Sequence, residues 1–544
     1  MLRAYASEDV RRAEATKVAA AAVDTLMKQA ADAVASEAAV ELTKRQYVVQ
    51  GSTVVALVGG GNNGGDALYA ASFLAGSGAK VRALLLTAQP HSRALAAASK
   101  AGVEIVDLTI LRKRTLVRRT VAEAAFWGGV WIDGIVGTGA KGPLRGIAEL
   151  VVDTLNAERD ASPDEPIVIA VDLPSGINPH SGEIAGPVLR ADVTVTMGAA
   201  KSPALLPQSS RAFGRLVVVD LGIGIPGVVA VSRLAAADVA DLWLVPGIED
   251  HKYTRGVPQI IAGSEEYPMT GVLCALGAAR AGAGMVRLDA PDEAQLALIT
   301  RLPEVVTRTG RFQSLLVGPG ISGTLRESKA VQAAGEAILA KVPVVIDAGA
   351  LKLVSEIASR LPKRARRRVD LLAPRPLSPL GETTVLTPHA GEAAALATRL
   401  GYNREQGGVS RNEIQSDPAK WARLLAEVIG ATVLVKGHTT VISGPNGELF
   451  SQADAPTWAG TAGSGDVLAG ILAAVLAMRQ AFVEAGEDVA SVPTFAAAAA
   501  WVHGSAATIA ADAEVGVGHP IIASDIAAAV PRALGRALGL LGEL

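Results

Sequence analysis

Two glycine-rich loops that end in aspartate lie in opposite halves of this chain, each beside an apolar segment. The first, residues 59–66 (GGGNNGGD), directly follows the apolar run 53–58, and the second, residues 460–466 (GTAGSGD), opens into the apolar run 467–472. A glycine loop at a helix start offers free backbone N–H groups and the positive end of the helix dipole, so it suits anions. Two such loops with different sequences predict two active sites in one polypeptide.

The length and composition of the chain predict two α/β domains. At 544 residues, the chain is too long for a single hydrophobic core. Hydrophobic residues make up 50%, charged residues 19% and aromatic residues 3%, a composition typical of parallel strands buried on both faces. The formal net charge of −2 gives no reason to expect a nucleic acid or an anionic membrane as a partner.

The cysteine content and the N-terminus indicate a cytoplasmic enzyme. Cys274 is the only cysteine, so no intrachain disulfide can form and a reducing compartment is expected. Residues 1–9 contain no uninterrupted apolar run, so no signal peptide is predicted. No apolar run reaches the roughly 20 residues that a membrane span needs. We expect no membrane partner, and we expect a homo-oligomer.

Strand-like and helix-like segments alternate along the chain, which predicts βαβ units in doubly wound sheets. Residues 222–227 (GIGIPG) interrupt this alternation, so we predict domains at 1–225 and 237–544. A helix is expected over 8–46, and the basic runs 112–119 and 363–368 are expected to be solvated surface loops. The predicted strands lie at 53–58, 81–86, 103–108, 130–133, 167–172, 193–197 and 216–220, then at 259–262, 285–288, 315–317, 342–347, 384–386, 432–435 and 440–442.

Polar side chains gather at the carboxyl ends of the first-half strands, where ligands bind in open parallel sheets. A second glycine loop, residues 134–139, follows one of these strands, and Lys201 follows another. A single acid at a strand end is often only the N-cap of the next helix, but that alternative does not account for the whole set. Its members are Asn62, Asn63, Asp66, Asp133, Asp172 and Ser175.

This set resembles the NAD(P)HX epimerase family over roughly residues 1–225. The family signature combines Asn-Asn-Gly-Gly-Asp (62–66), an aspartate before Gly-Thr-Gly (137–139) and Asp-Leu-Pro-Ser-Gly (172–176), although Ala67 stands where the family usually has glycine. The resemblance implies a Rossmann-like three-layer sandwich. It implies contacts between the hydrated dinucleotide and Asn62, Asn63, Gly64, Gly65, Asp66, Gly137, Thr138, Gly139, Ala140, Lys141, Gly142, Pro143 and Asp172.

The same resemblance implies a cation and an acid/base residue. A potassium ion would be held by Asn63, Asp133 and Ser175, since oxygen ligands suit a hard cation. Asp172 would be the acid/base residue, and Lys201 is a second candidate for the same chemistry.

The second glycine loop is short, but three strand-end loops support it. Residues 317–320 (VGPG), 387–392 (TPHAGE) and 436–440 (KGHTT) each follow a predicted strand. Asp466, beside glycine amides at a helix start, can deprotonate a substrate hydroxyl while the amides take phosphate charge. The alternatives are a capped helix at a tight turn and, for His389 and His438, a hydrogen-bonded structural role. The seven histidines show no metal-ligand spacing, so zinc is not expected.

These loops resemble the ADP-dependent NAD(P)HX dehydratase family, a branch of the ribokinase-like superfamily, over roughly residues 237–544. The resemblance implies a ribokinase-like α/β/α domain, Asp466 as catalytic base, and ADP with magnesium as co-substrate. Val272 stands where the family commonly has alanine. The implied substrate contacts are Val272, Gly320, His389 and Asp466, and the implied nucleotide contacts are Lys436, Gly437, His438, Thr439, Thr440 and Gly465.

Both resemblances occur in the order of bifunctional NAD(P)H-hydrate repair enzymes. Such an enzyme is an isomerase that interconverts the R and S forms of NADHX and NADPHX. It is also a lyase that dehydrates the S form to NAD(P)H at the expense of ADP, giving AMP and phosphate. An ATP-dependent kinase of a sugar or vitamin alcohol is the first alternative, but it leaves the N-terminal residues unexplained. A non-enzymatic N-terminal binding module is the second, but it needs none of Asp133, Asp172 and Lys201.

Overall fold

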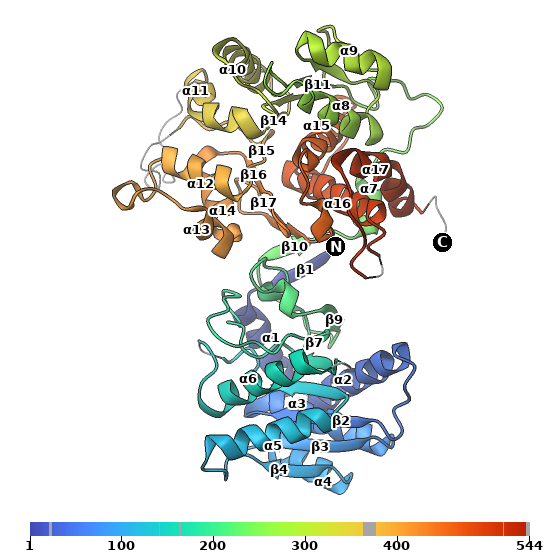
Figure 1. The fold of residues 1–544 in the computed structure, drawn as a ribbon, viewed down its shortest axis with the longest axis vertical. Helices are drawn as coiled ribbons and strands as arrows, with labels where there is room; N and C mark the ends of the chain where they lie inside the picture. The colour runs from blue at the N-terminus through green and yellow to red at the C-terminus, as the bar shows by residue number, and fades with distance from the viewer. Residues whose placement is uncertain (21–23, 141, 163–164, 363–376, 515, 540–544) are drawn as a thin grey trace. The chain divides into compact units, whose positions relative to one another are not determined.

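The computed structural model describes residues 1–20, 24–140, 142–162, 165–362, 377–514 and 516–539. It divides the chain into two compact units (Figure 1). The N-terminal unit is Arg3–Val231, and the C-terminal unit is Ser232–Leu544 with Met1–Leu2. The basic run 363–368 and Lys141 lie outside the described residues.

A parallel sheet of seven strands forms the centre of the N-terminal unit, in the order β4-β3-β2-β5-β6-β7-β9. The chain enters at β2, winds outward through β3 and β4, and then crosses to β5 on the other side of β2. This reversal leaves a crevice at the carboxyl ends of β2 and β5, the place where doubly wound folds bind ligands. The strands are β2 (Thr53–Val58), β3 (Lys80–Leu85), β4 (Glu104–Asp107), β5 (Val130–Gly134), β6 (Ile167–Val171), β7 (Val193–Met197) and β9 (Arg215–Val219).

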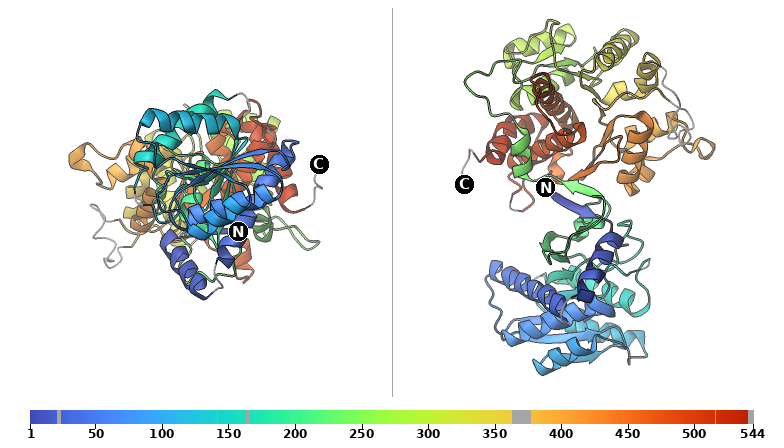
Figure 2. Two further views of the ribbon diagram at one scale, coloured as in Figure 1. Left: turned by 90° about the horizontal axis from the view of Figure 1, so that it is seen from below. Right: turned by 180° about the vertical axis from the view of Figure 1, so that it is seen from behind.

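Helices cover both faces of this sheet, as Figures 1 and 2 show from opposite sides. The helices α2 (Thr25–Lys44), α3 (Gly61–Gly76) and α4 (Ser92–Lys100) share one hydrophobic core with the sheet, and α5 (Arg114–Trp127) and α6 (Gly146–Ala161) share another. The predicted α/β class with a doubly wound N-terminal sheet is therefore confirmed.

Two predictions about the N-terminal unit are wrong. The expected helix over 8–46 is two helices, α1 (Ser7–Ala20) and α2, and Asp24 just before α2 has a left-handed φ of 58°. The run 112–119 lies on the surface as expected, but from Arg114 onward it is helix α5 and not a loop; its basic side chains are exposed while Val117 and Val121 are buried. The i, i+4 spacing of these valines is the helical signal.

The C-terminal unit contains a larger sheet in the order β12-β11-β13-β14-β15-β16-β17-β18-β10. Strands β12 to β16 are parallel, and β17 and β18 are antiparallel to their neighbours β16 and β17. The strands are β10 (Val231–Arg233), β11 (Pro258–Ile261), β12 (Arg287–Asp289), β13 (Ser314–Val317), β14 (Val344–Ile346), β15 (Thr384–Leu386), β16 (Thr432–Val435), β17 (Thr440–Ser443) and β18 (Leu449–Gln452).

One face of this sheet carries α8 (Thr270–Arg280), α15 (Ser464–Glu484), α16 (Val492–Ala510) and α17 (Ala523–Ala537), which share the main core. The other face carries α10 (Thr324–Leu339), α12 (Ala390–Arg399) and α14 (Pro418–Ile429) (Figure 1). Among the described helices, α15 alone has the length and composition of a membrane span, but 72% of its apolar window is buried, as expected of a core helix.

Helices α8 and α15 approach closely because glycines lie where they cross. A Cβ on Gly470 would come within 3.0 Å of the Cys274 carbonyl, and a Cβ on Gly277 would come equally close to the Val467 carbonyl. Real Cβ atoms essentially never come so close to backbone. The first turn of α15, which carries Asp466, is therefore positioned by backbone packing against α8.

We expect Gly470→Ala to destabilise the C-terminal unit by about 1–3 kcal/mol, because the added methyl overpacks this helix crossing. Gly335→Ala in α10 is the matched control, since its Cβ would meet only the flexible Arg360 side chain, at 3.4 Å. The control should be neutral or slightly stabilising. Urea unfolding followed by circular dichroism measures both, and equal effects would contradict the proposed packing role of Gly470.

Candidate active sites

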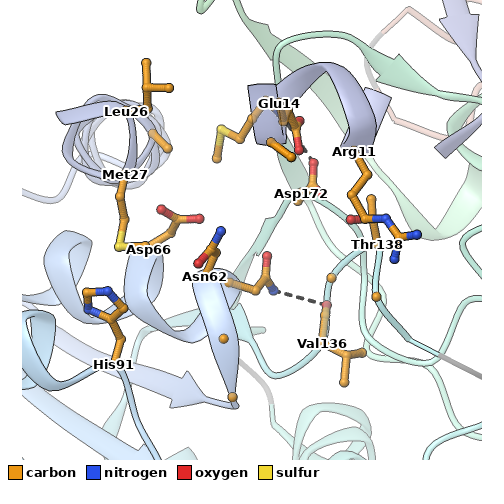
Figure 3. Close-up of a pocket in the computed structure, with 18 of the residues that line it drawn as sticks. Arg11, Glu14, Leu26, Met27, Asn62, Asp66, His91, Val136, Thr138 and Asp172 are labelled. Atoms are coloured by element: carbon orange, nitrogen blue, oxygen red, sulfur yellow. Dashed lines mark hydrogen bonds between the residues drawn. The ribbon is translucent and has the colours of Figure 1, made fainter. Parts of the chain in front are cut away.

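A cavity of about 1050 Å³ opens at the carboxyl ends of β2 and β5 in the N-terminal unit (Figure 3). The size suits a large ligand, since small-molecule sites commonly occupy about 300–1,000 Å³. Gly64, Gly65, Gly142, Pro143 and Lys201 are not among the residues that line it. The predicted site residues that do line it are Asn62, Asn63, Asp66, Gly137, Thr138, Gly139, Ala140 and Asp172.

Close backbone packing brings the two glycine loops of this cavity together. A Cβ on Gly59 would lie under 3.0 Å from the Ile135 carbonyl, and a Cβ on Gly64 would lie under 3.0 Å from the Gly59 carbonyl. Asn63 then reaches across, and its Nδ2 donates to the Val136 carbonyl at 3.1 Å. Gly59 and Gly64 thus serve loop packing, and the asparagines are the groups presented to the cavity.

Asp133 is a buried carboxylate beneath these loops. Its oxygens accept the Ser175 hydroxyl at 2.6 Å and the Ser175 N–H at 2.7 Å, and the Ser175 hydroxyl oxygen accepts the Val136 N–H at 3.2 Å. Asp133 is 0% exposed, and burial raises its pKa to about 6. Among the described residues no cation pairs with Asp133, whose hydrogen-bond donors are Ser175 and the Ile135 N–H, at 3.3 Å.

Asp172 is held in an unusual conformation at the end of β6. Its φ of 68° is left-handed, which costs a non-glycine residue of the order of 1–3 kcal/mol and is common at functional sites. The carboxylate accepts the Thr196 hydroxyl at 3.0 Å and is ion-paired with Lys201. Lys201 is fixed in turn by strand β8 (Ala200–Lys201), which pairs with Tyr5 and Ala4 of β1 (Leu2–Tyr5).

Helix α1 supplies lining residues that sequence analysis did not single out. Arg11 and Glu14 lie one turn apart on α1 and both line the cavity, as do His91 and Arg93 from the start of α4 (Figure 3). The i, i+3 spacing of Arg11 and Glu14 places them on one helix face. That spacing was the available signal, but nothing in the sequence says that this face meets the cavity.

The second set of predicted residues meets at the carboxyl ends of the C-terminal parallel strands. Gly320 follows β13, His389 follows β15, and the loop 436–440 joins β16 to β17. The Lys436 N–H donates to the Pro388 carbonyl at 2.8 Å, and the Lys436 Nζ would lie 3.4 Å from a Cβ on Gly465. The structure thus brings Lys436 beside the first turn of α15, where Asp466 lies.

Carboxylates surround the Lys436 ammonium. Its Nζ donates to Asp347 Oδ1 at 2.7 Å, and Glu392 Oε2 lies 4.0 Å away. Burial, together with the negative charge of Asp347, raises the pKa of Asp466 to about 7. Asp347 was missed as a site residue, although its position at the end of a predicted strand was visible in the sequence.

The remaining predicted residues have local roles as well. The His389 Nδ1 accepts the N–H groups of Gly391 at 3.0 Å and Glu392 at 3.1 Å, so it caps α12, while its side chain stays 59% exposed. Gly320 has a φ of 63° and lies so close to Thr270 that a side chain would not fit. Val272 is buried in α8, two residues beyond Thr270.

Two family models match the chain. The first, described as YjeF-related protein N-terminus, covers residues 23–202, and the second, NAD(P)H-hydrate dehydratase, covers residues 259–528. The bifunctional NAD(P)H-hydrate repair enzyme of Mycobacterium tuberculosis (strain H37Rv) is 38% identical over 479 residues, covering 87% of this chain and 89% of the relative. This chain belongs to the family of bifunctional NAD(P)H-hydrate repair enzymes.

Another relative covers most of the chain, and a solved structure covers 57% of it. The Mycobacterium leprae (strain TN) enzyme of the same name is 38% identical over 500 residues, covering 91% of this chain and 93% of the relative. A crystal structure of the ADP/ATP-dependent NAD(P)H-hydrate dehydratase from Bacillus subtilis, co-crystallised with ATP and Mg²⁺, is 25% identical, with a TM-score of 0.44. It covers 57% of this chain and 100% of that chain. The predicted family is confirmed by the two family models and the mycobacterial relatives.

Proposed function

We propose that the N-terminal unit interconverts the R and S forms of NADHX and NADPHX, and that the C-terminal unit dehydrates the S form with ADP. The predicted domains 1–225 and 237–544 carry these two activities. The observation that carries this proposal is the presence of two separate carboxylate centres, each at the carboxyl ends of parallel strands and each within the span of a family model. An ATP-dependent small-molecule kinase would not account for the carboxylates of the N-terminal cavity.

Asp172 is the acid/base residue of the epimerase in this proposal. The substrate hydroxyl lies on the ring carbon next to nitrogen, so the nitrogen lone pair assists its departure as water once a carboxylic acid has protonated it. Water then adds to either face of the planar ion and returns its proton to the carboxylate. Asp172 lines the cavity, whereas Lys201 does not, so Lys201 acts by holding Asp172. The loops 62–66 and 137–143 hold the dinucleotide.

Asn63, Asp133 and Ser175 hold potassium in this proposal. The residues fit the ion because an amide, a carboxylate and a hydroxyl can supply oxygen ligands, and the buried Asp133 carboxylate has no cationic partner among the described residues. When bound, potassium supplies the missing positive charge. The three residues join the ends of β2, β5 and β6, so the same site ties the loops of the cavity together.

Potassium should stabilise the N-terminal unit more at pH 8 than at pH 5. The pKa of Asp133 is raised from 3.8 to about 6, so without the ion this group destabilises the fold as the pH rises through that interval. At pH 5 the Asp133 of the folded unit, with a pKa of about 6, is mostly protonated and binds the cation poorly. Calorimetry in potassium chloride and in choline chloride of equal ionic strength measures the difference. Asp133→Asn should abolish it, and equal shifts at both pH values would contradict the site.

Asp466 is the base of the dehydratase in this proposal. It accepts the proton of the substrate hydroxyl as that oxygen takes a phosphoryl group from ADP. The ring nitrogen then expels phosphate, a much better leaving group than hydroxide, and loss of a proton from the neighbouring carbon restores NAD(P)H. Lys436 and the loop 437–440 bind the nucleotide with Gly465, and Val272, Gly320 and His389 contact the substrate. Magnesium would offset the phosphate charge, and Asp466 and Asp347 are the carboxylates available to hold it with the phosphates.

Dehydration of the S form should show an acidic limb near pH 7, because Asp466 must be ionised to act and its pKa is about 7. Asp347→Asn should move this limb to lower pH, since the Asp347 charge raises the pKa of Asp466. Asp466→Asn should reduce the rate at least ~100-fold. The exposed Asp488→Asn is the control, and NADH absorbance is the measurement. A folded Asp466→Asn variant with near-normal turnover would exclude the role.

Asp172→Ala tests the division of labour between the two units. With racemic NADHX, magnesium, potassium and ADP, this variant should restore half of the NADH quickly and the rest only at the spontaneous epimerisation rate. The reason is that in-line phosphoryl transfer from a fixed donor reaches a hydroxyl on one ring face only. The parent chain and the exposed Asp153→Ala control should run through both forms. A single fast phase in Asp172→Ala would contradict the assignment.

Three further assignments concern the cellular compartment, the phosphoryl donor and the oligomeric state. We place the enzyme in the cytoplasm, consistent with its single, buried Cys274. ADP rather than ATP is the assigned donor, which the same absorbance assay tests with each nucleotide. The homo-oligomer stays a prediction, which light scattering tests.

A further inference from the structure

One buried ammonium joins two carboxyl groups of the N-terminal cavity. The Lys201 side chain has 0% exposure, and its Nζ forms ion pairs with Asp172 Oδ1 and, at 3.3 Å, with Glu14 Oε1. Glu14 and Asp172 both line the cavity, and Figure 3 shows their carboxyl groups pointing toward one another. A substrate in the cavity therefore meets the two carboxyl groups, and Lys201 lies behind them.

The Lys201 ammonium is held in place by uncharged groups as well. Its Nζ donates to the Met197 carbonyl at 2.8 Å and to the Thr196 hydroxyl at 3.2 Å. These bonds fix its position but neutralise none of its charge. Since Lys201 cannot move toward either carboxylate, Glu14 and Asp172 have to share it.

The charges around this pair do not balance. Asp66, on α3, is a third buried carboxyl group that lines the cavity, and burial and its acidic neighbours raise its pKa well above the usual range. Burial likewise raises the pKa of Glu14. Three carboxyl groups around one ammonium leave an excess of negative charge, and like charges this close are mutually unfavourable. The charged or titratable groups lining the rest of the cavity are Arg11 on α1, Asp24 before α2, and His91 and Arg93 at the start of α4.

We propose that Glu14 is a positioning residue of the epimerase centre, which acts through the shared Lys201 to set the pH at which Asp172 gives or takes a proton. This inference rests on the proposed epimerase function. With Glu14 present, Asp172 receives only part of the stabilisation that Lys201 offers and faces a second negative charge. Without Glu14, Asp172 becomes the sole carboxylate partner of Lys201.

The inference predicts a specific change in the pH profile of epimerisation. Two coupled carboxyl groups titrate as a pair, with apparent pKa values that belong to both. Removing the Glu14 charge lowers the pKa of the carboxyl group that remains, because a like charge has been taken away. The limb of the profile that reports Asp172 should therefore move to lower pH. A purely structural role for Glu14 would reduce the rate equally at every pH.

The experiment uses the full-length chain in potassium buffer without nucleotide, so that the dehydratase is silent. Purified R-NADHX is the substrate, and chromatography follows the appearance of the S form between pH 5 and pH 9. In Glu14→Gln and Glu14→Ser, the apparent pKa assigned to Asp172 should fall by about one unit. At pH 7.5, kcat should fall about tenfold while KM changes less than about twofold, since the loss is in proton transfer.

Two further variants separate charge from shape. Glu14→Asp keeps the negative charge and should restore the parent profile, although its rate is lower. Glu8→Gln changes an exposed glutamate one and a half turns earlier on α1, and it should match the parent in rate and profile. Melting curves establish which variants are folded. Glu14→Gln and Glu14→Ser differ in size, so if one of them fails to fold, the other still tests the role of the Glu14 charge.

The outcomes separate the role of Glu14 from the proposed epimerase function. If the parent chain does not interconvert R- and S-NADHX, the proposed epimerase function fails and the role of Glu14 fails with it. If the parent is active but a folded neutral variant keeps the parent profile, only the role of Glu14 is overturned. A shifted profile that Glu14→Asp restores supports the inference.

Discussion

In both units, a glycine directly after a central strand allows the loop that follows to pack on the backbone of the neighbouring strand. Gly59 follows β2 and Gly318 follows β13, and a Cβ on either would lie under 3.0 Å from a carbonyl oxygen, that of Ile135 or Asp347 respectively. Any side chain there would push the two strand ends apart. Several polar groups of each site lie on the loops that follow these strands, so backbone contact sets the separation between those loops.

On this shared frame, each unit places one buried lysine among several carboxylates. Lys201 forms ion pairs with Asp172 and Glu14. Lys436 forms an ion pair with Asp347 and lies near Glu392. Each unit also has one further carboxyl group near its lysine, Asp66 in the N-terminal unit and Asp466 in the C-terminal unit. Burial raises the pKa of both. Such excess charge costs stability, but it produces neighbouring groups of unequal acidity, which is the arrangement that acid/base chemistry near neutral pH requires. The rigid strand ends prevent the cluster from relaxing.

The sequence predicted most of the strands, because continuous apolar runs are strong signals for parallel strands buried on both faces, but it did not predict the short strands β1, β8, β10 and β18. Strands β2, β7, β15 and β16 match their predicted bounds, and the polar residues after them were found for the same reason. Residues whose role depends on packing between distant segments were missed. Glu14 reaches Lys201 only because α1 folds over the cavity, and Asp347 was taken for the last residue of a strand.

Other differences show where a local pattern has two physical meanings. Gly64 was expected to contact a ligand, but it packs against the Gly59 carbonyl, and a motif cannot tell a glycine needed for ligand approach from one needed for backbone approach. His389 was expected at a substrate, and its ring nitrogen also accepts two helix N–H groups. The arginines of 112–119 were expected in a loop, but Arg114, Arg118 and Arg119 lie on a surface helix whose Val117 and Val121 are buried.

The geometry of the C-terminal centre gives a reason for two activities in one family. Asp466 is fixed in the first turn of a helix that is itself fixed by Gly470, and Lys436 is fixed by Asp347, so the proposed base and the proposed phosphate-binding cation have one relative orientation. In-line phosphoryl transfer in such a site can reach a hydroxyl on one ring face only. Widening the site for both faces would loosen the alignment on which the transfer depends. A separate centre for inversion avoids this conflict. It needs only a planar intermediate and a carboxyl group of suitable acidity, which the Glu14, Lys201 and Asp172 cluster can supply without a fixed hydroxyl position.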